Sequence, residues 1–582
     1  MPSQSAVALE RAVRAAEADG GPLSAAALAG SDRAETFPEP ACALLDAAGL
    51  AHHYVPVAHG GELRGYDELI GLVRTVARRD LTVAIAHGKT FLGTAPVWVA
   101  GTAEQAARLG EDVRRGAVVS WGLTERDHGS DLLAGEAAAV RDGADWLLDG
   151  EKWLINNATR GTRICVLART DPAGGPRGFS LFLVDKRRLP ESASTALPKI
   201  RTHGIRGADI SGIAFHGARI PGSALVGAEG TGMETVLKAL QLTRTVCVGL
   251  SLGAADHALR LTARFARDRR LYGGRLADLP QARRLLGEAS AAVLVAEAAA
   301  LVAGRSVTAL TDEMSVVSAV AKACVPTLVQ DAIAQLGELM GLRGYLTEHH
   351  EEGAFARLDR DHRLVSIFDG STAVNRNALI DQFPRLARGY GKRWWNEAGV
   401  AEATTLTAPS GAFRPERLRL LSGAGGSLVQ SLPDAVARLD ALAATGAVPA
   451  RLARLAGDLG AATAALHEEL AAQPRHPRDV PAGSFDLAER YELCFAGAAS
   501  LWLWLNNRPD DARFRTPDRP DHTWLQACLV TVLTRLGAPV GEEDRSAHDR
   551  LAALLVEGEP DPAHPPISVD MMTSAGMMRS TS

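Results

Sequence analysis

The stretch LTERDHGSD, residues 123–131, lies just after the point where the chain changes from helical to β character. Gly129 allows a bound group to approach the backbone closely, and the small hydroxyls of Thr124 and Ser130 suit phosphate oxygens. The same residues would also form an ordinary β-turn capped by a serine. The stretch therefore predicts either a phosphate-binding loop or a turn that binds no ligand. The surrounding segments help to decide between the two.

Helical segments flank a β segment. Residues 1–117 are rich in Ala, Leu, Arg and Glu at helical spacing and predict an N-terminal helical domain. In residues 118–228, short apolar runs alternate with turn residues, and Asp142-Gly143 and Asp149-Gly150 each predict a hairpin turn. Residues 229–390 return to the helical period. The run from residue 233 to 270 suggests more than one long helix there, and with two further long helices this predicts a four-helix bundle.

The remaining chain reads as an additional domain and a tail. Residues 391–556 contain helical runs separated by Pro-rich breaks and predict a second helical bundle. Residues 557–582 lack periodicity and predict a flexible tail. Trp502 and Trp504 lie close together in this part of the chain. Packing against the first bundle is the default expectation for them, and a docking surface for a carrier protein or a membrane is the alternative.

Composition excludes several classes of function. The 582 residues include 63 basic and 68 acidic side chains, a net charge of -5, so no basic surface for nucleic acid is expected. No uninterrupted apolar run approaches the roughly 18 residues of a membrane span, and the charged N-terminus does not read as a secretory signal. The six cysteines show neither CxxC pairs nor metal-ligand spacing. They predict isolated buried thiols, a cytoplasmic protein and no metal site.

The order helix, β domain, helix bundle, together with the motifs, resembles the acyl-CoA dehydrogenase family over roughly residues 35–390. Beyond residue 390 the resemblance is to family members with extra C-terminal helical domains. It implies a mainly α protein with a central small β domain, a barrel or sandwich. An N-terminal helical domain precedes this domain, and a four-helix bundle and a second helical bundle follow it.

In that family the loop matching residues 123–131 holds FAD. The resemblance implies that the threonine hydroxyl and nearby backbone amides meet the isoalloxazine edge, and that the serine meets the pyrophosphate. The cofactor-binding residues predicted here are Trp121, Leu123, Thr124, Gly129 and Ser130.

A second motif, DGEKWLINN at residues 149–157, resembles the family pattern Gly-x-Lys-x-Trp-Ile-Thr-Asn. In the family the Trp shields one face of the flavin and the Thr bonds near N5. Here Trp153 stands one place early, Leu154 takes the Trp position, and Asn156 takes the Thr position. Asn156 can still donate to a flavin edge. Trp153 could equally be a core aromatic residue.

Two further motifs resemble those that meet the flavin of a neighbouring subunit. Arg270, followed by Gln281, matches a family Arg and Gln, and an Arg binds pyrophosphate bidentately. Arg269 is the alternative match to the family Arg. The two arginines could also be no more than the solvated basic end of a helix, without a role in binding. Glu338 and Gly341 match a family turn in which Glu338 replaces a Gln.

The catalytic position follows Arg360-Asp361. The run Asp369-Gly370-Ser371-Thr372 matches the family's Glu-Gly-Thr-Ser, in which the Glu removes the α-proton of the acyl thioester. The resemblance makes Asp369 the base, leaves room for the thioester at Gly370 and places Ser371 at the flavin. An apolar pocket is expected to raise the basicity of the carboxylate. Arg244 matches a family Arg expected to hold that carboxylate ionised.

Asp is one methylene shorter than Glu, and a misplacement of about 1 Å can cost on the order of 100-fold in rate. The backbone could shift so that Asp369 reaches an ordinary acyl thioester. The substrate could instead be smaller, as in nitroalkane oxidases, which resemble this family and use an Asp base. Asp369 could also be only a helix N-cap, with catalysis lost or moved.

The predicted function is FAD-dependent α,β-dehydrogenation of an acyl group carried by CoA or by a carrier protein. Electrons would pass to an electron-transfer flavoprotein or to oxygen, and a homodimer is expected. The alternatives are a flavin oxidase acting on a small carbon acid such as a nitroalkane, and a catalytically silent FAD-binding scaffold.

Overall fold

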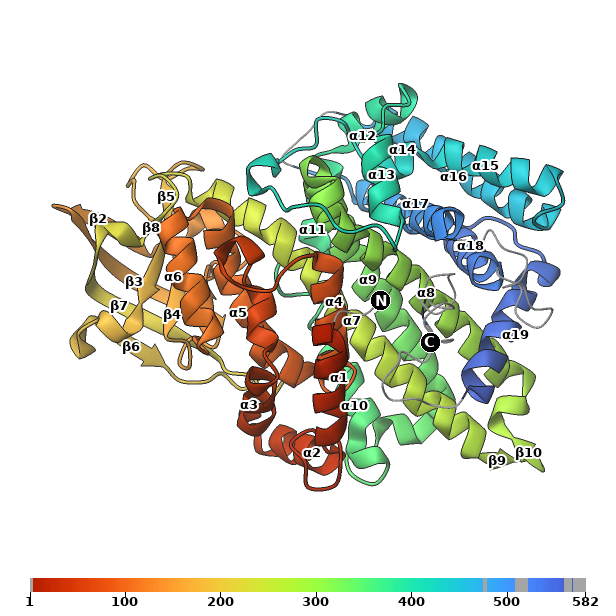
Figure 1. Ribbon diagram of the computed structural model, residues 1–582, viewed down its shortest axis with the longest axis horizontal. Helices are drawn as coiled ribbons and strands as arrows, with labels where there is room; N and C mark the ends of the chain where they lie inside the picture. Colours follow the sequence, from red (N-terminus) through yellow and green to blue (C-terminus); the bar gives the residue numbers. More distant parts are fainter. Residues whose placement is uncertain (1–3, 475–478, 508–521, 559–567, 569–582) are drawn as a thin grey trace.

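The computed structural model describes residues 4–474, 479–507, 522–558 and Ser568. Figure 1 shows a small sheet domain at one end, long helices through the centre and a further set of helices at the other end. The predicted tail lies outside the described residues apart from Glu557, Gly558 and Ser568.

Six helices build the N-terminal part: α1 (Gln4–Ala16), α2 (Ala25–Ala34), α3 (Glu39–Ala47), α4 (Tyr66–Ala77), α5 (Leu81–Ala100) and α6 (Ala103–Arg114). Helix α5 is apolar along most of its length and is buried on nearly all sides. It begins where the Asp80 carboxylate accepts a hydrogen bond from the Val83 amide, a side-chain N-cap that satisfies an otherwise free donor. Helices α4 and α5 both pack against α7, so the N-terminal part covers the central bundle.

The sheet domain contains β1 (Val119–Gly122), β2 (Ala138–Asp142), β3 (Asp145–Asn156), β4 (Arg163–Arg169), β5 (Phe179–Asp185), β6 (Ser194–Leu197), β7 (Ile210–Ile220) and β8 (Leu225–Val226). Their order is β6-β7-β3-β2-β4-β5-β8, and β1 pairs in parallel with β4. Its interior is a separate apolar cluster that includes Trp146 and Phe182, whose rings meet edge to face.

One of the two predicted hairpin turns is confirmed. Asp142 and Asp145 pair across the β2–β3 turn, and Gly143 there has a φ of +64°. The turn predicted at Asp149-Gly150 is wrong, because both residues lie inside β3. Gly150 instead forms a register shift with a φ of +115°, and an added Cβ would come within 2.7 Å of the Ala137 Cα. A glycine inside a strand can mark a bulge as well as a turn.

The central bundle is built from α7 (Gly232–Asp268), α8 (Pro280–Ala309) and α9 (Met314–Met340), with α11 (Thr372–Ile380) against α9. The run expected to form more than one helix is a single helix, α7, of 37 residues. The short strands β9 (Arg270–Leu271) and β10 (Gly274–Arg275) follow α7, while α10 (Ala354–His362) and α12 (Phe383–Gly391) flank α11. The segments 280–309 and 311–345 are long and apolar enough to cross a membrane, but 83% of the most apolar part of each is buried within the molecule.

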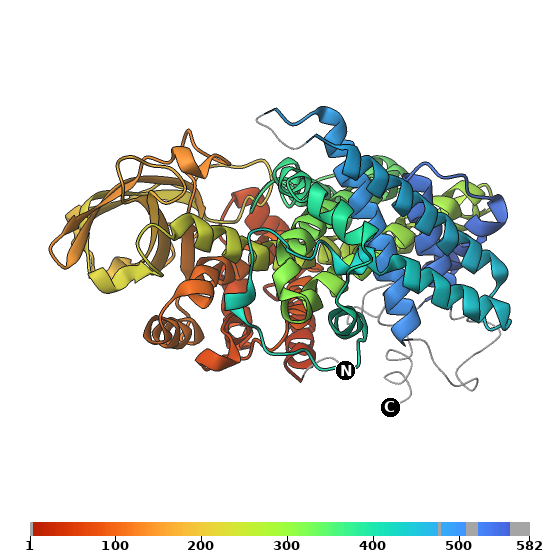
Figure 2. The same cartoon turned by 90° about the horizontal axis from the view of Figure 1, so that it is seen from above.

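The C-terminal helices are α13 (Glu397–Thr404), α14 (Ser427–Gln430), α15 (Leu432–Ala444), α16 (Ala450–Ala472), α17 (Ala482–Asn507), α18 (Thr523–Arg535) and α19 (Glu542–Glu557). Figure 2 shows them at the end of the molecule opposite the sheet domain. Helix α17 packs against both α9 and α11.

The tryptophan pair lies inside this second bundle. Trp502 and Trp504 are 3% and 2% exposed, and the Trp502 indole N–H donates to the Ser431 hydroxyl at 2.8 Å. Burial in the core is confirmed, while the partner of the Trp502 indole lies in the second bundle and not in the first bundle, where the contact was expected. All six cysteines are likewise buried and free, as predicted.

Candidate active site

The flavin side of the predicted site is formed by the ends of β1 and β3. Buried polar atoms there have no hydrogen-bond partner among the described residues, namely Trp121 Nε1 and both side-chain amide atoms of Asn156. Unsatisfied buried donors and acceptors are costly, and native structures rarely keep them without a ligand or water to meet them. These atoms therefore fit a polar, planar group bound against β1 and β3.

Thr124 has a different arrangement from the one expected. Its hydroxyl donates to the Trp153 carbonyl at 2.8 Å, and the Trp153 amide donates to the Thr124 carbonyl at 3.0 Å. The hydroxyl therefore ties the loop to β3 and can offer a bound group only its remaining acceptor capacity.

Glu125 shapes the loop that follows. Its carboxylate accepts hydrogen bonds from the amides of Glu136 and Ala137 and from Lys152 Nζ, the last at 2.7 Å. Burial opposes its ionisation, but Lys152 and the two amides outweigh burial and lower the pKa of Glu125. The result is a fixed loop between β1 and β2.

Leu154 occupies the position where the family has its shielding Trp. Its φ is +57°, at a second register shift in β3, and the side chain is 45% exposed. A positive φ is unfavourable for a residue with a branched side chain and persists only where the surroundings hold it. The strand therefore presents a single aliphatic side chain, and no indole ring, at this position.

The remaining predicted cofactor residues lie in two distant places. Gly129 and Ser130 are exposed on the sheet domain. Arg270, on the β9–β10 hairpin, is exposed at the far end of the bundle (Figure 1), and Gln281, Glu338 and Gly341 are exposed as well. One chain does not bring the two groups together. They could meet only across a subunit contact, as the resemblance implies.

The loop from Val365 to Ser371 carries the predicted base. Asp369 has a φ of +57° and Gly370 a φ of +93°. The φ of Gly370 favours glycine, and an added Cβ would lie 2.9 Å from an Arg244 guanidinium nitrogen. The N-cap of α11 is Ser371, whose hydroxyl accepts from the Val374 amide at 3.3 Å. The alternative in which Asp369 is only the helix cap is therefore wrong.

The Asp369 carboxylate is 13% exposed, and its partners differ from those predicted. Lys89 Nζ lies 2.8 Å from Oδ2, and the Cys247 thiol donates to the same oxygen at 3.1 Å. Arg244 Nε donates to the backbone carbonyl of Asp369, at 3.1 Å, and not to the carboxylate. Arg244 therefore fixes the backbone of the loop, while Lys89 is the ion partner of the carboxylate.

The electrostatics of Asp369 also differ from expectation. Burial opposes ionisation, yet Lys89, the Cys247 hydrogen bond and Lys322 outweigh it and hold the pKa of Asp369 below its ordinary value. The expectation of an apolar pocket that raises the basicity of Asp369 is wrong, because two lysines lie near the carboxylate.

Lys322 is the second cation that the sequence analysis missed. Its side chain is fully buried, and Nζ donates to the carbonyls of Val365 at 2.6 Å and Gly370 at 3.3 Å. Burial lowers the pKa of Lys322 to about 8, although Cys247 and Asp369 oppose that shift. The ring of Phe368 lies beneath Lys89, with Nζ 3.9 Å from the ring centroid.

A sequence signal for both lysines existed. Lys89 and Lys322 each stand within an otherwise apolar helical run, LTVAIAHGKTFLGTA in α5 and SVVSAVAKACVPTLV in α9. Lysine is almost never fully buried without a partner or a function. The local sequence does not predict which carboxylate or carbonyl group each lysine contacts.

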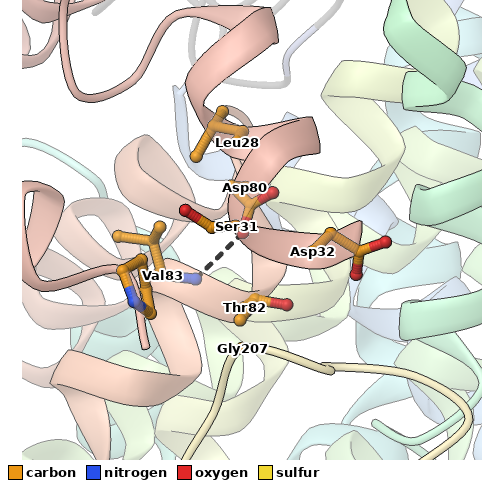
Figure 3. Close-up of a pocket in the computed structure, with 8 residues that line it drawn as sticks. Leu28, Ser31, Asp32, Asp80, Thr82, Val83 and Gly207 are labelled. Carbon is orange, nitrogen blue, oxygen red and sulfur yellow. Dashed lines mark hydrogen bonds between the residues drawn. The ribbon is translucent and has the colours of Figure 1, made fainter. Parts of the chain in front are cut away.

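Arg360 and Asp361 of the predicted motif are structural. Arg360 pairs with Asp32, while Asp361 accepts from the Ile205 amide at 2.9 Å and from the Thr82 hydroxyl at 3.2 Å. A hollow of about 10 Å³, no larger than a water molecule, lies beside this junction at the start of α5 (Figure 3). Asp369 is not among the residues that line it.

The chain therefore combines an N-terminal helical part, a small sheet domain and a central helical bundle, with a buried carboxylate at Asp369 and unpartnered polar atoms at Trp121 and Asn156. Residues 120–218 match the model of the acyl-CoA dehydrogenase middle domain, and residues 230–383 match that of the acyl-CoA dehydrogenase C-terminal domain. A probable acyl-CoA dehydrogenase of Mycobacterium leprae is 30% identical over 352 residues, which cover 59% of this chain and 87% of that protein. The chain belongs to the acyl-CoA dehydrogenase family and is an oxidoreductase of the type that acts on CH–CH bonds.

Solved structures show the same fold. An acyl-CoA dehydrogenase complexed with FAD from Bacillus anthracis aligns over 100% of this chain and 91% of its own, with a TM-score of 0.66 and 18% identity. The alignment therefore includes the C-terminal helices. Butyryl-CoA dehydrogenase from Megasphaera elsdenii aligns over 65% of this chain and 97% of its own, with a TM-score of 0.58 and 22% identity.

Proposed function

We propose that this protein catalyses FAD-dependent α,β-dehydrogenation of an acyl thioester, with Asp369 as the base. The observation that carries the proposal is the buried Asp369 carboxylate, held on a positive-φ turn beside Gly370 and next to the Arg244 guanidinium. FAD, when bound, would accept the substrate's β-hydrogen as hydride. Trp121 and Asn156 would meet its ring system, since they lie at the positions that the resemblance assigns to the flavin and their buried polar atoms have no partner among the described residues.

The chain's own residues account for the proton. The lowered pKa keeps Asp369 ionised at neutral pH, so its carboxylate can accept the α-proton on Oδ1 or Oδ2. Arg244 and Lys322 fix the loop by donating to the carbonyls of Asp369 and Gly370. The Lys89 ion pair must loosen before Asp369 becomes a strong base, because a close cation stabilises the carboxylate against protonation.

The acyl carrier is proposed to be CoA or a carrier protein. Among the structural neighbours are the butyryl-CoA dehydrogenase above and a prolyl acyl carrier protein oxidase, the latter with a TM-score of 0.58 and 19% identity. Another neighbour comes from a structure of the electron transferring flavoprotein of Acidaminococcus fermentans, and the proposed electron acceptor is an electron-transfer flavoprotein or oxygen. The cytoplasmic location remains a prediction.

A homodimer is also proposed. Large apolar side chains are exposed next to the residues expected to meet a partner's FAD: Tyr272 is 95% exposed, Leu342 77% and Tyr345 75%. Exposed large apolar side chains are typical of a protein interface. Light scattering of the purified protein checks the dimer, and a monomer at micromolar concentration would contradict it.

The catalytic proposal is tested by anaerobic mixing of FAD-loaded protein with a panel of acyl-CoAs and acyl carrier proteins while the flavin absorbance is followed. Bleaching by a thioester in the parent, and its loss in Asp369→Asn, supports the proposal. Bleaching by nitroalkanes alone would assign the carbon-acid oxidase instead. Firm FAD binding with no bleaching by any compound would point to a scaffold.

A further inference from the structure

The reaction centre holds more positive than negative charge. Lys89, Arg244 and Lys322 lie within hydrogen-bonding distance of atoms of Asp369 or Gly370. The three cationic side chains are at most 11% exposed. Among the described residues the only carboxylate that contacts this group is that of Asp369. Three buried cations therefore face one anion.

An excess of buried positive charge is costly unless something compensates it. Removing a charge from water carries a large penalty, which only a close opposite charge and good hydrogen bonds offset. A single aspartate can offset one of the three. The other two cations therefore form a binding site for a further negatively charged group.

Donors are also left over. Arg244 has five N–H groups, and its one hydrogen bond within the described chain comes from Nε. Lys322 has three N–H groups and donates to two carbonyls. The spare donors lie at Gly370, where a Cβ would come within 2.9 Å of the guanidinium. A forked guanidinium beside an ammonium suits a carboxylate.

We propose, on the basis of the proposed function, that the preferred substrates are acyl thioesters whose acyl group itself carries a carboxylate, recognised by Lys89, Arg244 and Lys322. The phosphates of the carrier are separated from the α-carbon by the long pantetheine arm and cannot occupy the same place. A carboxylate on the acyl group remains close to the carbon from which Asp369 takes its proton.

This assignment gives Lys89 a second role. A substrate carboxylate competes with Asp369 for the Lys89 ammonium, which lies 2.8 Å from Asp369 Oδ2. When Lys89 turns to the substrate, Asp369 loses its strongest stabilising partner and becomes a better base. Charged substrates would thereby release the base, and neutral ones would leave it paired.

The test uses matched pairs of CoA thioesters. Each dicarboxylic acyl-CoA of five to eight carbons is compared with its terminal methyl ester, which has nearly the same shape and no charge. In the FAD-loaded parent, anaerobic bleaching is expected to be at least about 100-fold more efficient with the acid than with the ester, as measured by kcat/KM. In Lys89→Met and Lys322→Met the preference is expected to fall at least about 10-fold.

Lys238→Met is the matched control. Lys238 lies on α7, the helix that carries Arg244, but it pairs with Glu234 at the surface, so the preference for the acid should equal that of the parent. Dissociation constants of both thioesters, measured with Asp369→Asn by perturbation of the flavin spectrum, check recognition without turnover. The acid should bind more tightly than the ester.

The outcomes separate the two proposals. Equal rates with acids and esters would overturn the carboxylate assignment and leave dehydrogenation intact, with the cations serving only the charge that any thioester develops. A preference that persists in both lysine variants would also overturn it, because the carboxylate would then be read elsewhere. No bleaching at any chain length would overturn the proposed function and this assignment together.

Discussion

The two sides of the reaction centre differ in how their polar groups are satisfied. On the sheet side, Trp121 and Asn156 present buried polar atoms without partners in the described chain. On the bundle side, Asp369 already has Lys89 and Cys247 as partners. The sheet side can form new hydrogen bonds with a bound cofactor. On the bundle side, Asp369 must first lose its ion pair with Lys89 before it can accept a proton.

The difference teaches what each side contributes. Unpartnered donors gain hydrogen bonds on binding, so the sheet side should govern cofactor affinity. A carboxylate that is paired with a lysine is harder to protonate, so the bundle side should govern the reaction rate and the choice of substrate. Helix α5 connects the two sides, because the Asn157 amide donates to the Ala86 carbonyl one turn before Lys89.

The largest expected effect is on the bundle side. Asp369→Asn removes the proton acceptor and should lower the bleaching rate by about 1,000-fold, within the range of general-base catalysis. FAD content, read from the absorbance spectrum, should equal that of the parent. Loss of FAD together with the rate would mean that the two sides are not separable.

The next effect tests what holds the bundle side in place. Glu492 on α17 is 2% exposed, and its carboxylate accepts a hydrogen bond at 2.9 Å from Arg376 of α11, the helix that follows the loop of Asp369. Glu492→Gln should lower the free energy of unfolding by about 2 kcal/mol, since it weakens a buried ion pair. Urea unfolding measures the change.

Glu489→Gln is the control for that variant. Glu489 also contacts Arg376, at 2.8 Å, but its side chain is 45% exposed. Its loss should cost less than about 1 kcal/mol. Equal costs for the two variants would contradict the view that the second bundle supports the catalytic loop through Glu492.

A smaller effect is expected on the sheet side. Asn156→Leu removes both unpartnered amide atoms and should weaken FAD binding about 10-fold, the value of one or two hydrogen bonds. Titration of the apoprotein with FAD measures the dissociation constant. An unchanged constant would show that Asn156 does not meet the cofactor.

The smallest effect is a pH dependence of substrate choice. Burial lowers the pKa of Lys322 to about 8, so the side chain is charged below that pH and increasingly neutral above it. The preference for a carboxylate-bearing thioester should therefore be full near pH 7 and decline severalfold by about pH 9. The kcat/KM ratio of each acid and ester pair, measured across this range, checks the direction. In Lys322→Met the decline should be absent, and a parent-like decline there would assign it to another group.

The sequence by itself determined the family and the order of helical, β and helical segments. These features depend on local patterns: helical and strand periodicity, a glycine at a required turn, and motifs of fixed spacing. The burial of Trp502 and Trp504 followed from their apolar helix in the same way.

Within the single strand β3, the local sequence pattern was not enough to predict the backbone conformation. Asp149-Gly150 has the composition of a turn but forms a bulge, because the pairing of β3 with β7 continues past it. Trp153 was left open between flavin and core, and the structure pairs its backbone with Thr124.

Only the tertiary structure decided which charges surround Asp369. Lys89 is 280 residues from Asp369 in the sequence, and Cys247 is 122 residues away. Their approach depends on how α5, α7 and α9 pack, and a difference of one residue in helical phase, about 100° around the axis, would turn a side chain away from the loop. Periodicity predicts that a helix buries one face, but the partner of a lone lysine on that face is fixed by the packing of the helices.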